Sequence, residues 1–113
     1  LLALVSRPQG LDAAALHAFA DRLVRPEAED AFRVVEDLLA QLLARLARVA
    51  AGAPAAASDD AAAIEELGRR APAAQWAELR EAIAASFARA DVLNLDRRQT
   101  LISACFAIER AGA

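Results

Sequence analysis

The longest hydrophobic pattern in the chain predicts a central helix. Apolar side chains recur at intervals of three and four residues at Phe32, Val35, Leu38, Leu39, Leu42, Leu43, Leu46 and Val49. This spacing places them on one face of an α-helix. Pro26 suits a first helical turn and the acids after it favour a helix N-terminus, so we expect a helix from Glu27 or Glu29 to Ala51. A coiled-coil seam is the alternative, but the stripe is short and wide, which favours the core of one domain.

A second apolar stripe predicts a helix of about 20 residues that begins after Pro72. Its members fall on a single side of the helix: Trp76, Leu79, Ile83, Phe87 and Ala90. A tryptophan in such a stripe is typical of a core anchor, and a role facing a partner is the alternative. Glu78 and Glu81 are expected on the outer side.

Shorter elements are predicted around these two helices. Residues 1–5 are typical of a helix end, because proline and glycine follow within residues 7–10. Asp12 is expected to cap a helix whose apolar face is formed by Leu16, Phe19, Ala20 and Leu23. Residues 52–60 are rich in alanine and predict a flexible internal loop. After it we expect a short helix through Ile64 and Leu67, capped by Ser58 or Asp59 and ended by Gly68.

The end of the chain predicts a sharply started terminal helix. Asp96 can cap its first turn, and Gln99 can reach back to the Asp96 N–H in a capping box, so the helix should begin at Arg97. An apolar stripe follows at Leu101, Ile102, Cys105, Phe106 and Ile108, with Arg98, Ser103, Glu109 and Arg110 placed to face water. Docking on the rest of its own bundle is the first expectation for this stripe.

Composition supports an all-α fold with one domain. The chain has 113 residues, is 58% hydrophobic with much of that alanine, and contains no tyrosine. Alanine favours helix, and the residues that strands prefer are few. We therefore predict a single helical bundle of about five or six helices over residues 1–113. The formal net charge is −3 and charges of both signs alternate, so no basic stripe indicates direct contact with DNA.

Patterns of catalytic chemistry are absent from the sequence. His17 is the only histidine, and neither it nor the single cysteine, Cys105, has the spaced partners of a metal site. All thirteen basic residues are arginine, which excludes the lysine of a phosphate-binding loop. Charged residues interrupt every apolar run, so no membrane span is predicted. We expect a non-catalytic domain without metal or cofactor, and a buried free thiol in a reducing cytoplasm.

The terminal segment carries a resemblance to a known family. Leu93, the run Asn94-Leu95-Asp96-Arg97-Arg98-Gln99 and the ending Ala107-Ile108-Glu109 are similar to the C-terminus of the delta-prime subunit of the bacterial DNA polymerase III clamp loader, in its alphaproteobacterial form. Residues 11–46 and 76–79 resemble the same domain less specifically. Two features depart from the family pattern: Ala104-Cys105-Phe106 stands where two bulky aromatics are more usual, and the loop around Pro54 is alanine-rich.

The resemblance implies a role in assembly. In that family a helical C-terminal domain joins its counterparts in a collar, which holds together the loader whose ATP-driven subunits open the sliding clamp. Because the chain begins Leu1-Leu2, we expect it to be a fragment lacking the AAA+-like N-terminal domains. The implied partners are the delta and gamma/tau subunits, and the expected interface residues are Arg97, Arg98, Gln99 and Trp76.

Two other classes of function stay open. One is a free-standing helical adaptor, for example a homodimer formed through the long leucine-rich helix. The other is a small helical enzyme or ligand carrier, which would need a deep pocket with convergent polar groups.

Overall fold

A computed structural model describes residues 13–23, 29–55 and 57–113 of the chain. Within these residues the protein is all-α and contains five helices: α2 (Ala13–Leu23), α3 (Glu29–Ala50), α4 (Ala61–Gly68), α5 (Ala73–Leu93) and α6 (Arg97–Ala111). The predicted class, a helical bundle, is confirmed. The predictions for residues 1–5, for the break at residues 7–10 and for the Asp12 cap lie outside the described residues.

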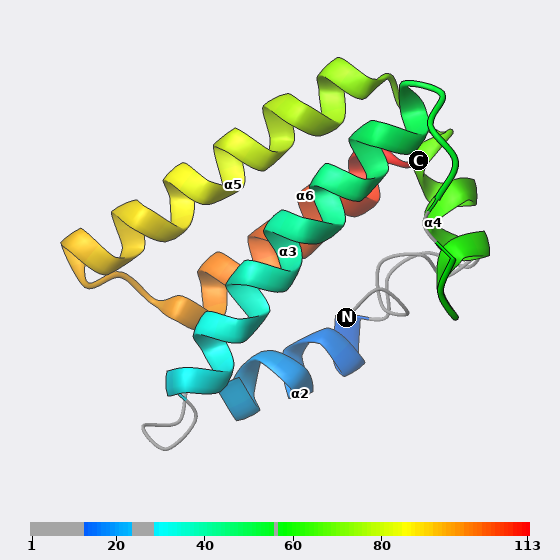
Figure 1. Cartoon of the computed structure of the whole chain (residues 1–113). Coiled ribbons are helices and arrows are strands. Elements are labelled where there is room, and N and C mark those ends of the chain that lie inside the picture. Colours follow the sequence, from blue (N-terminus) through cyan, green and yellow to red (C-terminus); the bar gives the residue numbers. More distant parts are fainter. Residues whose placement is uncertain (1–12, 24–28, 56) are drawn as a thin grey trace.

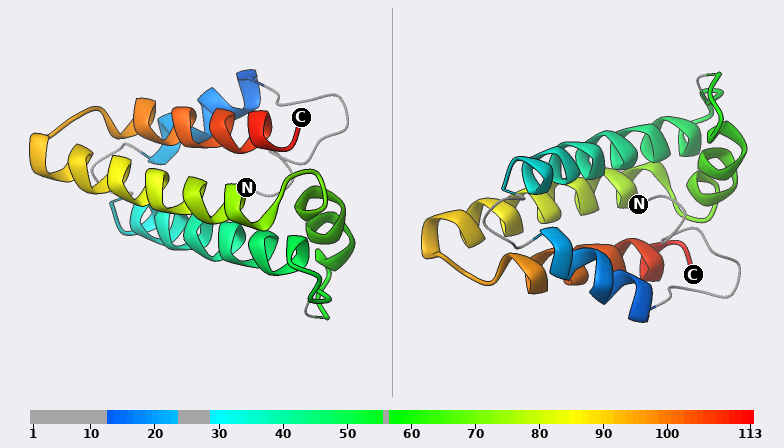
Figure 2. Two further views of the ribbon diagram at one scale, coloured as in Figure 1. Left: turned by 90° about the horizontal axis from the view of Figure 1, so that it is seen from above. Right: turned by 90° about the horizontal axis from the view of Figure 1, so that it is seen from below.

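Four of the helices lie alongside one another and the fifth crosses one end (Figure 1). α3 and α5 are antiparallel and share the most extensive contact, and α6 returns beside α5 in the opposite direction. α2 packs mainly on α6 and touches α3, which completes the ring of four (Figure 2). α4 packs on α3 at the end of the bundle where α3 stops and α5 starts.

The leucine-rich stripe of α3 faces the interior of this bundle. Seven of the eight predicted positions are buried: Phe32, Val35, Leu39, Leu42, Leu43, Leu46 and Val49. The prediction that the stripe serves an intradomain core is therefore confirmed. Leu38 is the exception, because 46% of its surface remains exposed. It lies at the margin of the stripe, where no neighbouring helix among the described residues covers it.

The second predicted stripe behaves as expected. In α5, Trp76, Ile83, Phe87 and Ala90 are buried and Leu79 is half-buried against the core. Phe87 meets Phe32 of α3 with ring centroids 5.7 Å apart and a tilted geometry that aromatic pairs favour. Pro72 is the N-cap of α5, which starts at Ala73.

Gly68 has a different role from the predicted one. It lies within α4 as its last residue, and Arg69 follows in right-handed helical conformation, so no left-handed glycine ends this helix. A Cβ at Gly68 would lie 3.0 Å from Val49 Cγ1 and 3.1 Å from the Leu46 carbonyl oxygen. The glycine therefore allows α4 to approach α3 closely. Its carbonyl also accepts a 3.0 Å hydrogen bond from the Trp76 indole N–H.

The loop between α3 and α4 is tied to α3 by polar contacts. Asp60, and neither Ser58 nor Asp59, is the N-cap of α4, and it makes no side-chain capping bond. Its carboxylate instead accepts hydrogen bonds of 2.8 and 3.0 Å from the Arg45 guanidinium. This ion pair draws the Asp60 side chain away from the helix terminus, so α4 has no side-chain cap, and the predicted cap at Ser58 or Asp59 is wrong. The flexibility of residues 52–60 stays a prediction.

Candidate subunit interface

The start of α6 is built by the segment that carries the family resemblance. Asn94 adopts the left-handed conformation, with φ 51° and ψ 46°, and ends α5. Asparagine tolerates this conformation better than other residues with a side chain apart from aspartate. Asp96 then caps α6 by accepting a 3.0 Å hydrogen bond from the Arg98 N–H. The predicted helix start at Arg97 is confirmed.

Gln99 does not form the predicted capping box. Its side-chain amide lies 3.3 Å from the Ser103 hydroxyl, one turn further along the helix, and donates to it. The Asp96 carbonyl, which a capping box does not use, accepts hydrogen bonds from the Thr100 backbone N–H and hydroxyl. One half of the predicted capping arrangement is therefore present, and the reciprocal half is wrong. The Gln99 side chain is exposed on the outer face of α6.

Arg98 joins α6 to α2. Its Nε lies against Asp21 Oδ1, without the alignment that a hydrogen bond requires, so this contact is an ion pair. Its Nη2 is 3.0 Å from His17 Nδ1. A guanidinium can only donate, so His17 Nδ1 is the acceptor in this contact. The only histidine of the sequence thus takes part in a contact between helices.

Arg97 is engaged within the chain as well. Its guanidinium carbon lies 5.4 Å from the centroid of the Phe32 ring, within the range of a cation–π contact. This contact connects the start of α6 to the start of α3. Both arginines remain partly exposed. They hold helices of one chain together, and a partner would meet only the part of each side chain that faces solvent.

Trp76 offers no side-chain surface to a partner, because it is fully buried. Its indole N–H is satisfied by the Gly68 carbonyl, so its apolar rings and its polar edge are both occupied inside the bundle. The expectation of a core anchor is confirmed. Of the four expected interface residues, Arg97, Arg98 and Gln99 come together at the start of α6, whereas Trp76 lies in the core.

A hollow runs along α6 next to Gln99. It has a volume of about 350 Å³ and is lined by His17, Gln99, Ile102, Ser103, Phe106 and Arg110. Ile102 is buried, whereas Phe106 is only half-buried, so the floor of the hollow is apolar and its rim is polar. Apolar centres with polar rims are typical of protein interfaces. The sequence indicated Phe106 only as part of the core stripe.

Exposed apolar residues form two further surfaces that sequence reasoning missed. Val92, Leu93 and Leu95 surround the turn between α5 and α6 and are 82%, 59% and 48% exposed. Val34 and Leu38 lie one turn apart on α3 and are 55% and 46% exposed. The signal in the sequence was the off-stripe position of Val34 and the run of apolar residues at a turn, where polar residues are usual.

Acidic residues from two helices lie near one another at the end of α5. The pKa of Glu36 is raised by partial burial and, to a smaller extent, by the negative charges of Asp91 and Asp37, while Arg33 opposes the shift. Asp91 belongs to α5 and Glu36 to α3, so this is a contact of like charges between helices.

Reactive groups in the described part of the chain are few. Burial raises the pKa of the Cys105 thiol to about 11, so it is protonated at neutral pH and a poor nucleophile. The described residues contain no cluster of three or more histidine, cysteine or acidic side chains that could hold a metal ion. None of the described helices combines the length and the hydropathy needed to cross a bilayer.

Three surfaces stand out among the described residues: the hollow on α6, which has both polar and apolar lining, the exposed apolar residues around the turn between α5 and α6, and the exposed pair Val34 and Leu38 on α3. Comparisons of the chain with models of protein families, with curated proteins and with solved structures find no match.

Proposed function

We propose that this chain is the helical collar domain of a clamp-loader delta-prime subunit. In this role it binds the delta and gamma/tau subunits and supports ATP-dependent loading of the sliding clamp during DNA replication, without catalysing a reaction itself. The proposal covers residues 1–113 as one non-catalytic domain of a longer, cytoplasmic protein.

One observation carries the proposal. Four residues of the segment that carries the family resemblance each have a structural role. Asn94 supplies the left-handed turn, Asp96 the cap, and Arg97 and Arg98 the contacts to α3 and α2. A motif that sets the angle and position of the last helix fits a family whose last helix belongs to an assembly domain.

The hollow on α6 is the surface that best fits such an assembly. Its apolar floor of Ile102 and Phe106 can accept an apolar side chain of a sister subunit, and Gln99, Ser103 and Arg110 can provide hydrogen bonds at the rim. The arginines at the start of α6 would then act mainly by positioning this helix.

The test is reconstitution with the implied partners. The tagged 113-residue chain would be mixed with purified delta and gamma/tau subunits of the same genome and analysed by pull-down and size-exclusion chromatography. We expect a stable complex with at least one of these subunits. Ser103→Arg should weaken it, because Ser103 is exposed and a long charged side chain there fills the hollow without disturbing the core.

The control is Ala85→Arg, which adds the same side chain at an exposed position on α5. It should leave the complex intact. Failure of the unmodified chain to bind delta or gamma/tau would refute the proposed function. Equal binding by the Ser103→Arg and Ala85→Arg variants would instead refute only the location of the interface on α6.

A free-standing adaptor is the alternative. Its predicted dimerisation surface, the leucine stripe of α3, is largely buried against α4 and α5, so only Leu38 and the neighbouring Val34 remain exposed there. Light scattering of the isolated chain distinguishes the two functions, because the adaptor would be a dimer and the collar domain is expected to be monomeric without its partners.

A further inference from the structure

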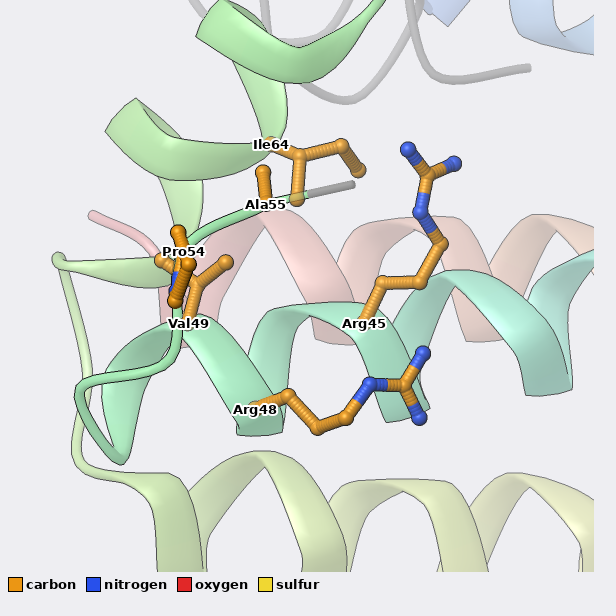
Figure 3. A pocket seen from close by; sticks show the side chains of 6 residues that line it. All are labelled: Arg45, Arg48, Val49, Pro54, Ala55 and Ile64. Carbon is orange, nitrogen blue, oxygen red and sulfur yellow. The ribbon is translucent and has the colours of Figure 1, made fainter. Parts of the chain in front are cut away.

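A second hollow lies between the end of α3, the following loop and α4 (Figure 3). It has a volume of about 260 Å³ and is lined by Arg45, Arg48, Val49, Pro54, Ala55 and Ile64. Figure 3 shows both guanidinium groups on one side of it, with Val49, Pro54 and Ala55 on the other. The hollow therefore has a cationic side and an apolar side.

Arg45 is already neutralised by the protein. Asp60 receives two hydrogen bonds from its guanidinium, and the Ser58 hydroxyl contacts both residues. The hydrogen bond from Arg45 holds the pKa of Asp60 well below its usual range, and Asp60 in turn raises the pKa of Arg45. Arg45 and Asp60 together therefore carry no net charge.

Arg48 is the cation that remains available. Its side chain is exposed, and within the described residues its guanidinium forms no ion pair or hydrogen bond. No acidic side chain lines this hollow, although Asp37 and Arg80 share a neighbouring hollow with Arg48. The guanidinium fork of Arg48 can therefore bind a carboxylate in bidentate fashion beside an apolar wall.

We propose that this hollow binds a short-chain aliphatic carboxylic acid, with the carboxylate on Arg48 and the aliphatic chain against Val49, Pro54, Ala55 and Ile64. The small volume sets the size of the ligand, because it lies just below the range of pockets for drug-sized molecules. Inorganic phosphate fits less well, since it would leave the apolar wall uncovered. The proposal is independent of the collar function.

The experiment is a titration of the isotope-labelled 113-residue chain with isovalerate, followed by amide chemical shifts in NMR spectra. We expect saturable shifts at Ala53, Ala55 and Ile64 with a dissociation constant in the millimolar range. Isovaleramide, which has the same shape without the charge, and inorganic phosphate, which has charge without the aliphatic chain, should each bind at least about tenfold more weakly.

Two variants locate the site. Arg48→Gln should weaken isovalerate binding about tenfold, because it removes the charge-assisted hydrogen bonds. Arg89→Gln, an exposed arginine on α5 that does not line the hollow, should leave binding unchanged. Absence of saturation, equal binding of the amide or of phosphate, or equal affinity of the Arg48→Gln and Arg89→Gln variants would overturn the proposal. The spectrum of each variant also reports whether it is folded.

Discussion

Apolar burial holds together both the side of the bundle formed by α3, α4 and α5 and the side formed by α2 and α6, but the helix contacts are more extensive on the first side. On the first side, Trp76, Leu46, Ile64 and Leu67 are almost completely buried, and Gly68 lets two backbones approach closely. On the second side, Leu16 and Ala20 provide the burial from α2, and Arg98 adds a polar contact to Asp21 and His17.

The two kinds of contact contribute differently to the stability of the domain and to the orientation of its helices. Burial of large apolar side chains contributes most of the folding free energy, whereas a partly exposed ion pair contributes little but restricts the geometry of the groups that it joins. We therefore expect the first side to determine whether the domain folds, and the second to determine how α2 lies on α6.

The largest effect should come from Trp76→Ala. It removes the largest fully buried side chain and leaves the Gly68 carbonyl without its donor, so the free energy of unfolding should fall by about 3–5 kcal/mol. Denaturant unfolding followed by circular dichroism measures this loss. The matched comparison is Leu46→Ala on the first side with Leu101→Ala on the second, because both leucines are fully buried, and an equal loss at the two would contradict the proposed difference between the two sides.

Gly68→Ala tests the close approach of α4 to α3. Alanine should favour helix, but its Cβ would meet Val49 and the Leu46 carbonyl, so we expect a net loss of about 1–2 kcal/mol in the free energy of unfolding. At Gly112 a Cβ would meet the end of the Leu67 side chain and no backbone atom as closely. Gly112→Ala should therefore lower the free energy of unfolding by less than Gly68→Ala. A stabilised Gly68→Ala variant would show that the helices can move apart freely.

Arg98→Ala tests the polar contact between α2 and α6. Because the side chains of Arg98 and Asp21 are 37% and 58% exposed, the loss in the free energy of unfolding should be no more than about 1 kcal/mol. Cys105 is buried in α6, so a thiol reagent should label it faster in this variant if α2 opens locally. Arg89→Ala is the control for removing an exposed arginine, and equal labelling rates in both variants would show that the Arg98 contact does not hold α2 on α6.

The smallest effect is expected at Asp60, and it depends on pH. The folded-state pKa of Asp60 lies below its ordinary value of 3.8, so its contribution to stability is fully present above that value and is lost as the pH falls through the folded-state pKa. Asp60→Asn should therefore lower the melting temperature slightly at neutral pH, with a difference that shrinks below about pH 4. Asp59→Asn removes a neighbouring charge without breaking the pair with Arg45, and should lack this trend.

Much of the fold followed from short-range patterns. The stripes of α3 and α5 predicted both helices and nearly all their buried residues, because a helical period of apolar residues needs only local geometry to place them on one face. The Asp96 cap was predictable for the same reason. The predicted capping box was wrong because the Gln99 side chain bonds to Ser103, and the predicted cap of α4 was wrong because the helix begins after Asp60, whose side chain pairs with Arg45.

The candidate sites were less predictable. Arg97, Arg98 and Gln99 were identified from the sequence, but the contacts of the two arginines with Phe32, Asp21 and His17 depend on helices distant in the chain. The hollow beside Arg48 had no signal in the sequence. Its lining comes from α3, α4 and the loop between them, and the spacing of apolar residues along the chain does not indicate that these segments lie together.

The sequence by itself determined that the chain is helical, where its long helices begin and end, and which faces they bury, because these properties arise from interactions between residues close along the chain. Only the tertiary structure decided that Gly68 is a contact point between helices, that Trp76 points inward to the Gly68 carbonyl, and that Leu38 stays exposed. These outcomes depend on which helices lie next to one another, and the amphipathic pattern specifies only that each apolar face must be covered.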